Sequence, residues 1–213
     1  MSQSEEIQSL LKKKYPHPKT ALVFSTPFEL LVATILSAQC TDTRVNTVTE
    51  KLFSRYKRIE DYACLDIKVL EELVRPTGFY RNKAKNIIAC ANRIVKDFCG
   101  KVPSELSKLV QLPGVARKTA NVVLFGAFGK NEGIAVDTHV IRLSRRLGLT
   151  KSSDPVKIEA DLMGIIEKKQ RGLFSLRLIL HGRQTCAARN PKCAQCVLKE
   201  VCSSRTDVVN KSG

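Results

Sequence analysis

The sequence lacks any apolar run long enough to cross a membrane and any segment at its start that resembles a secretion signal. The longest apolar stretch, LLVATILSAQ at 30–39, is broken within a few residues, whereas a membrane-spanning helix needs about 20. The N-terminal MSQSEEIQ is acidic and polar and has no apolar signal core behind it. These absences exclude membrane-embedded and secreted classes, so we expect a cytoplasmic protein with no membrane partner.

Sustained alternation of apolar and polar residues is also missing, which excludes a large β-sheet. Apolar residues instead recur at helical spacing, as in Ala84, Ile87, Ile88 and Ala91. Helix-start signals recur as well: TPFE at 26–29 has a capping residue followed by proline, and Asp42, Asp66, Asp137 and the pair Asp154-Pro155 can each open a helix. The pattern predicts an all-α fold of roughly ten helices.

Acidic residues are scarce: 20 Asp and Glu stand against 36 Lys and Arg, for a net charge of +16 and a pI near 9.7. A folded chain of this charge favours polyanions such as nucleic acid or anionic lipid, although a basic surface without a specific site gives the same balance. No block of like charge is long enough to be a disordered tail. The charge is therefore expected on a folded surface.

The eight cysteines fall into two groups. Cys40, Cys64, Cys90 and Cys99 are scattered through apolar helical patterns and are interpreted as small buried hydrophobic residues. The others follow the spacing C-x6-C-x2-C-x5-C near the C-terminus: Cys186, Cys193, Cys196 and Cys202. Four thiols in so short a segment of an intracellular chain suit one tetrahedral metal ion or one iron–sulfur cube better than disulfides. The spacing alone leaves zinc and iron open.

The segment LVQLPGVARKTANVV at 109–123 predicts two helices joined by a tight turn at Gly114. The second helix would present its N–H groups to an anion, which on DNA is a backbone phosphate. An ordinary helix–turn–helix corner would have the same pattern.

Two residues near this segment have the chemistry of a catalytic pair. Lys118 falls in the first turn of the second helix, where the helix dipole and the nearby Arg117 disfavour its charged form and predict a lowered pKa. A neutral amine there could form a Schiff base. Asp137, in AVDTHV at 135–140, is predicted to be a helix N-cap whose carboxylate could stabilise a positive sugar. A solvated surface lysine and a simple helix cap are the alternative interpretations.

Taken together, these segments resemble the endonuclease III family of DNA base-excision-repair glycosylases from about Phe28 to Cys202. LPGVARKTANVV resembles its helix-hairpin-helix motif, AVDTHV the segment with its catalytic aspartate, and the stretch 178–202 its iron–sulfur loop. LSAQCTD at 36–42 and TGFYRNKAKNI at 77–87 resemble segments that touch the opened duplex. Each motif alone is only suggestive, but five in the same order are specific.

The resemblance implies roles for individual residues. Lys118 would be the nucleophile and Asp137 its carboxylate partner, and the four C-terminal cysteines, Cys186, Cys193, Cys196 and Cys202, would hold a [4Fe–4S] cluster. Gln39 would fill the gap left by an extruded nucleotide and Phe79 would wedge the base stack open. The implied DNA contacts are Gln39, Phe79, Leu112, Gly114, Val115, Ala116, Thr119 and Arg183.

The hairpin of the family usually reads Gly-x-Gly, whereas this chain has Ala116 at the second glycine. A positive φ there would strain alanine by about a kilocalorie per mole. We expect instead a helical start, at which alanine still offers its N–H.

The resemblance also implies an architecture: two helical domains with a DNA-binding cleft between them. One is a six-helix domain at 21–131 that contains the helix-hairpin-helix motif (about 104–128). The other combines 1–20 with 132–213 and carries the catalytic aspartate and the iron–sulfur loop (186–202).

The implied activity is that of a bifunctional DNA glycosylase and AP lyase. The chain would act as a monomer on double-stranded DNA containing damaged pyrimidines or abasic sites, in a prokaryote-like, nucleoid-associated setting. Two alternatives stay open: a non-catalytic, metal-stabilised DNA-binding scaffold, and a monofunctional or mismatch-specific glycosylase.

Overall fold

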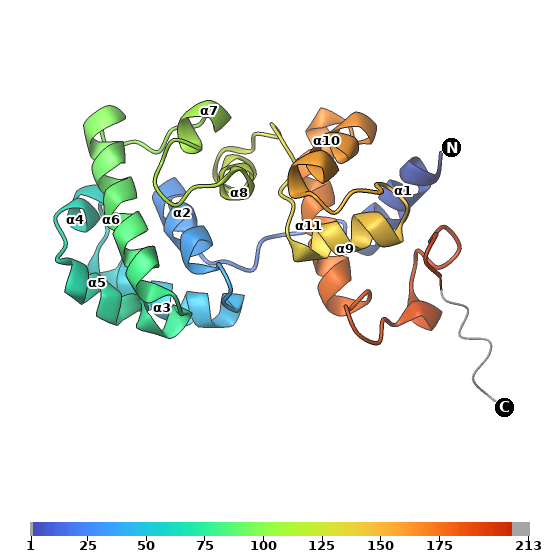
Figure 1. The fold of residues 1–213 in the computed structure, drawn as a ribbon, viewed down its shortest axis with the longest axis horizontal. Helices are drawn as coiled ribbons and strands as arrows, with labels where there is room; N and C mark the ends of the chain where they lie inside the picture. Colours follow the sequence, from blue (N-terminus) through green and yellow to red (C-terminus); the bar gives the residue numbers. More distant parts are fainter. Residues whose placement is uncertain (1, 206–213) are drawn as a thin grey trace. The chain divides into compact units, whose positions relative to one another are not determined.

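The computed structural model describes residues 2–205, and within this range every regular element is a helix. The chain forms two compact units (Figure 1). Unit 2 is the continuous segment 20–130, and unit 1 combines residues 1–19 with the segment from 131 onward. The ranges expected from the sequence differ from these by one residue at each boundary. Among residues 2–205, no helix combines the length and apolar character that crossing a bilayer requires.

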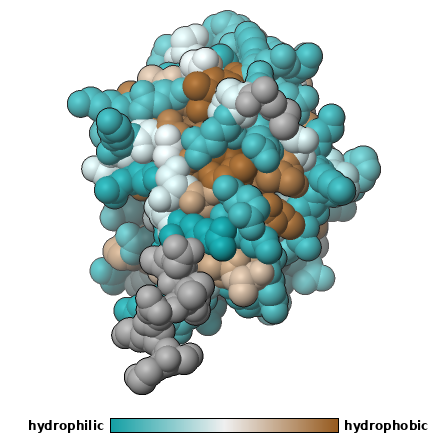
Figure 2. Space-filling view, turned by 90° about the vertical axis from the view of Figure 1, so that its right-hand side faces the viewer, coloured by the Kyte–Doolittle hydropathy of each residue, from teal (hydrophilic) through white to brown (hydrophobic). Residues whose placement is uncertain are grey.

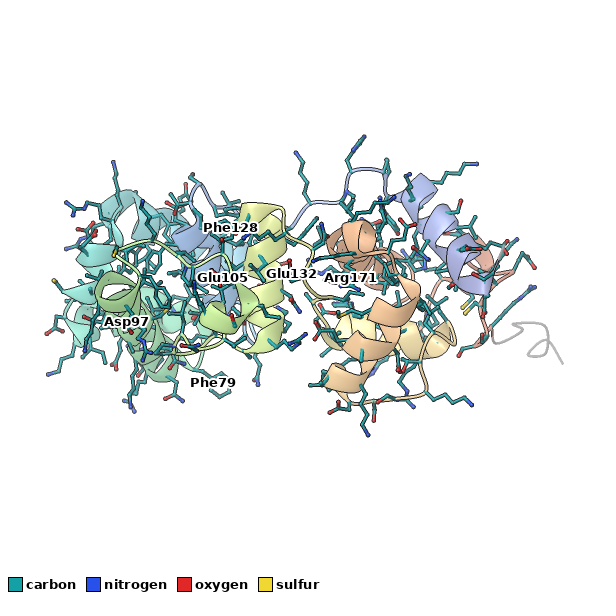
Figure 3. The ribbon with its side chains drawn as sticks, turned by 90° about the horizontal axis from the view of Figure 1, so that it is seen from above. Phe79, Asp97, Glu105, Phe128, Glu132 and Arg171 are labelled. Carbon is teal, nitrogen blue, oxygen red and sulfur yellow. The ribbon has the colours of Figure 1, made fainter. Side chains whose placement is uncertain are left out.

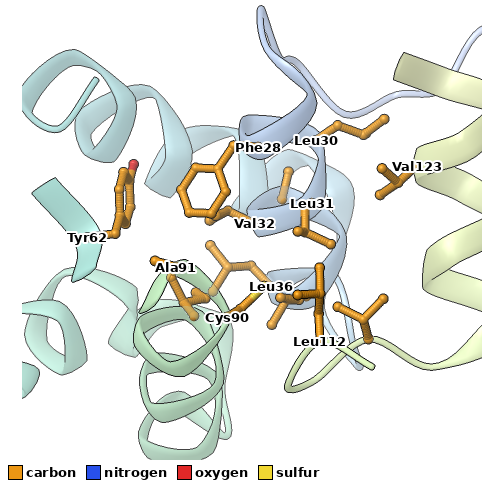
Figure 4. Close-up of a cluster of buried hydrophobic side chains, with 14 of the residues drawn as sticks. Phe28, Leu30, Leu31, Val32, Leu36, Tyr62, Cys90, Ala91, Leu112 and Val123 are labelled. Carbon is orange, nitrogen blue, oxygen red and sulfur yellow. The ribbon is translucent and has the colours of Figure 1, made fainter. Parts of the chain in front are cut away.

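Unit 2 is built around α2, which packs against α6 on one side and α8 on the other (Figure 4). The buried side chains are mainly aliphatic, with Phe28 and Tyr62 in an edge-to-face contact at 5.0 Å between ring centroids. The elements of the unit are α2 (Pro27–Leu36), α3 (Asp42–Arg55), α4 (Ile59–Ala63), α5 (Ile67–Val74), η1 (Arg75–Thr77), α6 (Tyr80–Asp97), α7 (Leu106–Leu109) and α8 (Arg117–Phe128).

Unit 1 packs its N-terminal helix against its last long helix, so the two ends of the described chain share one core. Ile7 and Leu11 of α1 lie in this core with Phe174 and Leu178 of α11. The elements of the unit are α1 (Gln3–Lys14), α9 (Thr138–Arg146), α10 (Pro155–Ile165), η2 (Lys168–Gln170), α11 (Arg171–Gln184) and η3 (Cys193–Gln195).

Several predicted helix starts are confirmed by their capping hydrogen bonds. The Asp66 carboxylate accepts from the Lys68 N–H at 2.7 Å, and the Asp154 carboxylate accepts from the Lys157 N–H at 2.9 Å just before Pro155. Thr26 caps α2 by accepting from the Glu29 N–H at 3.1 Å. Local chemistry of the chain therefore sets these boundaries.

Three local expectations are wrong. Thr41, rather than Asp42, caps α3, because the hydroxyl one residue earlier already accepts the Arg44 N–H. Of the four scattered cysteines expected to be buried, Cys64 and Cys99 are exposed. Residues 20–130 hold seven α-helices rather than six, since α4 has only five residues and is too short to show a helical periodicity.

Candidate functional site

The turn between α7 and α8 requires glycine at its centre. The Val115 N–H donates to the Leu112 carbonyl at 3.1 Å and closes the turn. Gly114 has φ +76°, and a Cβ on it would come within 2.8 Å of the Asn86 Cβ on α6. Any other L-residue would therefore meet both backbone strain and a steric clash. The predicted hairpin is present, with α6 packed directly beneath its turn.

Ala116 replaces the second glycine of the hairpin without strain. It is the N-cap of α8, with φ −78° and ψ 167°, and its side chain forms no capping hydrogen bond. Alanine adopts this extended conformation freely. The start of α8 thus lacks the serine, threonine or aspartate cap that would compete with a bound anion, and its dipole favours negative charge.

The hairpin residues expected to contact DNA differ in accessibility. Gly114 and Ala116 are exposed, whereas Leu112 is 3%, Val115 5% and Thr119 9% exposed. The three buried side chains stabilise the hairpin from below. A phosphate could reach only the backbone at those positions.

Lys118 lies in the first turn of α8 and is half-buried. It follows Ala116 by two residues, so the turn at Gly114 and the start of α8 fix its place on the surface of unit 2. A lysine held at the positive end of a helix is a candidate nucleophile.

Asp137 is the N-cap of α9 in unit 1, as predicted. Its Oδ1 accepts from the Val140 N–H at 2.8 Å, and its side chain is half-buried. Buried residues precede it at 133–136, so the carboxylate follows a segment anchored in the core. One carboxylate oxygen binds the helix N–H, and this orients the group.

Basic side chains cluster on the surface of α9. A shallow depression of about 740 Å³ is lined by Arg142, Arg145, Arg146 and Lys151 together with Thr138. The face drawn in Figure 2 is largely hydrophilic, with apolar areas near its middle. Arg183, in the last turn of α11, is exposed. The guanidinium groups of Arg142 and Arg146 donate to backbone carbonyls at 186 and 187. The exposed Arg145, Lys151 and Arg183 therefore suit the phosphates of a nucleic acid backbone best.

Gln39 and Phe79 share a feature that the sequence did not reveal. Both are exposed and both adopt left-handed backbone conformations, with φ 53° at Gln39 and φ 48° at Phe79. Phe79 is 64% exposed and lies at the periphery of unit 2 (Figure 3). Left-handed non-glycine residues cost about 1–3 kcal/mol each and concentrate at functional sites.

Lys83 was missed as a candidate altogether. It is 5% exposed, and its Nζ donates to the carbonyls of Leu36, Ala38 and Thr77, each at 2.8 Å. Burial lowers its pKa. The sequence does carry a signal, because helical spacing places Lys83 on the same face of α6 as the buried Ile87 and Ile94.

The four C-terminal cysteines lie in one loop after α11, and all are half-buried free thiols. Across residues 2–205, no three His, Cys, Asp or Glu side chains are arranged to hold a single metal ion. The donor set nevertheless fits an iron–sulfur cluster in its chemistry. Burial chiefly, and the other cysteines of the loop further, raise the pKa of Cys196, and a bound metal centre would relieve that repulsion between thiolates.

Hydrogen-bond donors surround these sulfurs. Arg146 Nη1 donates to Cys186 Sγ at 3.2 Å, and the Leu198 N–H points to Cys196 Sγ at 3.4 Å. His181 Nε2 lies 3.4 Å from Cys196 Sγ, and its Nδ1 lies 3.2 Å from the Tyr15 hydroxyl. Such donors are the usual outer partners of cluster thiolates.

Comparison with known proteins places this architecture in a class. Residues 32–168 match the family described as "HhH-GPD superfamily base excision DNA repair protein". The chain is 55% identical to Endonuclease III of Synechocystis sp. over 93% of its length and 91% of the relative. It is 49% identical to Endonuclease III of Bacillus subtilis over 88% of its length and 86% of the relative.

Solved structures agree. The fold matches "Structure of a non-covalent Endonuclease III-DNA Complex" with a TM-score of 0.90 and 41% identity, covering 96% of this chain and 97% of that one. It matches "Structure of a Trapped Endonuclease III-DNA Covalent Intermediate" with the same score and 42% identity, covering 96% and 98%. The chain belongs to the endonuclease III family of the HhH-GPD superfamily. It is a base excision repair enzyme of the DNA glycosylase and AP lyase class.

Proposed function

We propose that this chain removes oxidised or otherwise damaged pyrimidines from duplex DNA through a covalent intermediate on Lys118. The observation that carries the proposal is the place of Lys118, half-buried in the first turn of α8, two residues beyond the Gly114–Ala116 turn. One relative of this fold has been trapped as a covalent intermediate with DNA, and a helix-terminal amine is suited to that chemistry.

The first step replaces the bond between C1′ and the base by a bond between C1′ and the amine of Lys118. The neutral amine of Lys118 attacks C1′ of the extruded deoxyribose, and the bond from C1′ to the base breaks with its electron pair leaving on the base. Positive charge develops on the sugar, and the carboxylate of Asp137 stabilises it. The departing base takes up one proton of the attacking amine. The bond from C1′ to the ring oxygen O4′ then breaks with its electron pair on O4′, which takes up the second amine proton. The product is an imine between Lys118 and C1′ of the opened sugar.

The second step breaks the strand. The protonated imine acidifies the C2′ proton, which a base removes, and the resulting electron pair expels the 3′ phosphate by β-elimination. Water then hydrolyses the imine and regenerates Lys118. Glycosylase and lyase activities thus follow from the same amine.

DNA capture uses the basic surface and the hairpin. Phosphate would lie at the backbone of Leu112, Gly114, Val115 and Ala116, with Thr119 supporting the start of α8 and Arg183 contacting phosphate from unit 1. Gln39 would fill the gap left by the flipped nucleotide, and the exposed Phe79 would separate neighbouring bases. Flipping costs least at a damaged or poorly paired base, which favours lesions.

We also assign a [4Fe–4S] cluster to Cys186, Cys193, Cys196 and Cys202. The cluster would supply a cross-link that orders the loop, with Arg146 donating to one sulfur and the Leu198 N–H to another. Iron and sulfide analysis with visible absorbance distinguishes it from zinc. We also propose that the enzyme works as a monomer in the cytoplasm.

Borohydride trapping on duplexes with thymine glycol or an abasic site tests this function. The wild-type chain should give a reduced protein–DNA adduct and nick both substrates. Lys118→Gln should bind DNA but give no adduct. Nicking by that variant at the wild-type rate would refute Lys118 as the nucleophile, and DNA binding by the wild type with neither adduct nor nick would favour a scaffold.

A further inference from the structure

Two exposed side chains of unit 2 are held on strained backbone by neighbouring turns. Gln39 lies in the turn between α2 and α3, which the Cys40 N–H closes by donating to the Ser37 carbonyl at 3.1 Å. Phe79 follows η1 and Gly78, and its own side chain provides no helix cap. Neither exposed side chain gains burial that would offset its left-handed conformation, so the surrounding structure must impose it.

One buried side chain binds both turns. The ammonium of Lys83 donates to the carbonyl of Leu36, the last residue of α2, and to the carbonyl of Ala38, the residue before Gln39. Its third hydrogen bond goes to Thr77, two residues before Phe79. Its three donors thus meet three carbonyls, each at 2.8 Å, in a site that is 5% exposed.

The electrostatics explain why a cation occupies this place. The carbonyls of Leu36 and Thr77 end α2 and η1, and carbonyl ends of helices carry partial negative charge. All three acceptors of the Lys83 ammonium are backbone carbonyls, so the cation serves the two turns. An uncharged aliphatic side chain there would leave these buried carbonyls without their donor.

We propose that Lys83 is a positioning residue for duplex opening: its ammonium clamps the Gln39 turn to the Phe79 turn, so both side chains enter DNA together at a fixed spacing. The proposal rests on the roles proposed above for Gln39 and Phe79. Lys83 itself touches neither base nor sugar. Its removal would free the two turns to move independently while Lys118 stays in place on α8.

The experiment compares cleavage of an abasic site in a fully paired duplex with cleavage of the same site inside a three-nucleotide mispaired bubble, under single-turnover conditions. Lys83→Met removes the ammonium and keeps a flexible side chain of similar length. Lys96→Met is the matched control, because Lys96 is an exposed lysine near the other end of α6.

Lys83→Met should cleave the paired duplex about 10- to 100-fold more slowly than Lys96→Met, since small misplacements at this scale are amplified in rate. In the bubble, where opening is already done, the two variants should differ by less than about threefold. A comparable loss on both substrates, or no loss on either, would overturn the clamp.

Thermal unfolding of each variant is measured alongside. If Lys83→Met does not fold, Lys83→Gln is tested in the same pair of substrates, because its amide keeps two donors and can support folding while it lacks the charge and the third donor. A loss confined to the paired duplex is expected, and a comparable loss on both substrates would overturn the clamp. Failure of the clamp is distinct from failure of the proposed chemistry: Lys118→Gln should lose trapping on both the paired duplex and the bubble, whatever Lys83 does.

Discussion

Within residues 20–130 of unit 2, the buried charged side chain is that of Lys83. Its ammonium binds carbonyls of two turns that lie next to each other. In unit 1 the buried polar groups join segments that are much farther apart in sequence, 162 and 166 residues for two of the contacts. Arg177 of α11 donates to the Tyr15 carbonyl at 3.1 Å, and the Tyr15 hydroxyl contacts His181, which in turn contacts Cys196. Unit 2 is assembled from one continuous segment, whereas in unit 1 a series of side-chain contacts connects the end of α1 through α11 to the cysteine loop.

The largest expected effect concerns what unit 1 contributes to chemistry. Asp137→Asn keeps a side-chain oxygen that can accept the Val140 N–H, so the melting temperature should change little. It removes the negative charge that we propose stabilises the developing positive sugar, and the single-turnover rate should fall by about 10²- to 10³-fold. Base release from a thymine-glycol duplex measures this rate. An unchanged rate would reduce Asp137 to a helix cap.

The second-largest effect tests whether unit 1 can lose stability while unit 2 keeps it. Cys196→Ala removes a proposed cluster ligand and the sulfur that His181 contacts, so unit 1 should lose several kcal/mol of local stability, on the order of a structural metal site. Hydrogen exchange should accelerate in α1 and α11 and stay unchanged in α2 and α6. Equal acceleration in all four helices would contradict the division, and no acceleration would show that the loop does not support α1.

Two glycines of unit 2 give a matched pair. Gly114 and Gly129 both have positive φ, but a Cβ meets Asn86 at 2.8 Å only at Gly114 and meets nothing within 4 Å at Gly129. Gly129→Ala should cost about 1–2 kcal/mol of stability from backbone strain alone. Gly114→Ala should cost more and also weaken binding to undamaged duplex about tenfold or more, which corresponds to about 1.4 kcal/mol.

Chemical denaturation and fluorescence anisotropy with a labelled duplex provide the two readouts. Equal DNA affinity for Gly114→Ala and Gly129→Ala would mean that the hairpin turn is not a phosphate site.

The smallest effect is a pH dependence located in unit 1, which contains all three histidines of the chain. Burial chiefly, with Arg142 and Arg183, lowers the pKa of His139 below 6.5, while Asp137 raises it. The unfolded chain therefore binds this proton at a higher pH than the folded chain does, and stability is lost as pH falls below about 6.5.

Substitution of His139 isolates that contribution. His139→Gln should flatten the dependence of melting temperature on pH between 7 and 5 relative to the wild type. An unchanged slope would assign the acid sensitivity to other groups.

The division between local and distant contacts also decides what the sequence could predict. The caps at Asp66, Asp137 and Asp154 involve partners two or three residues away, and their sequence signals were sufficient. The all-α class followed from periodicity, and the family followed from five ordered motifs. The negative φ of Ala116 was also anticipated, since a helix start accepts any L-residue there.

Contacts over long separations were not predictable. Lys83 binds carbonyls more than 40 residues away, and Tyr15 meets His181 across 166 positions. Helical spacing indicates that Lys83 is buried, but no short pattern identifies the partners of either side chain. The left-handed conformations of Gln39 and Phe79 were missed because neither residue type favours them. Those conformations are imposed by the packing of their turns.

The most direct test of the central claim locates the covalent bond itself. Wild-type protein is reduced with borohydride on an abasic duplex, digested with a nuclease and a protease, and the residual sugar adduct is mapped by tandem mass spectrometry. The adduct should lie on the side chain of Lys118. An adduct on any other lysine or on the N-terminal amine, with Lys118 unmodified, would contradict the mechanism.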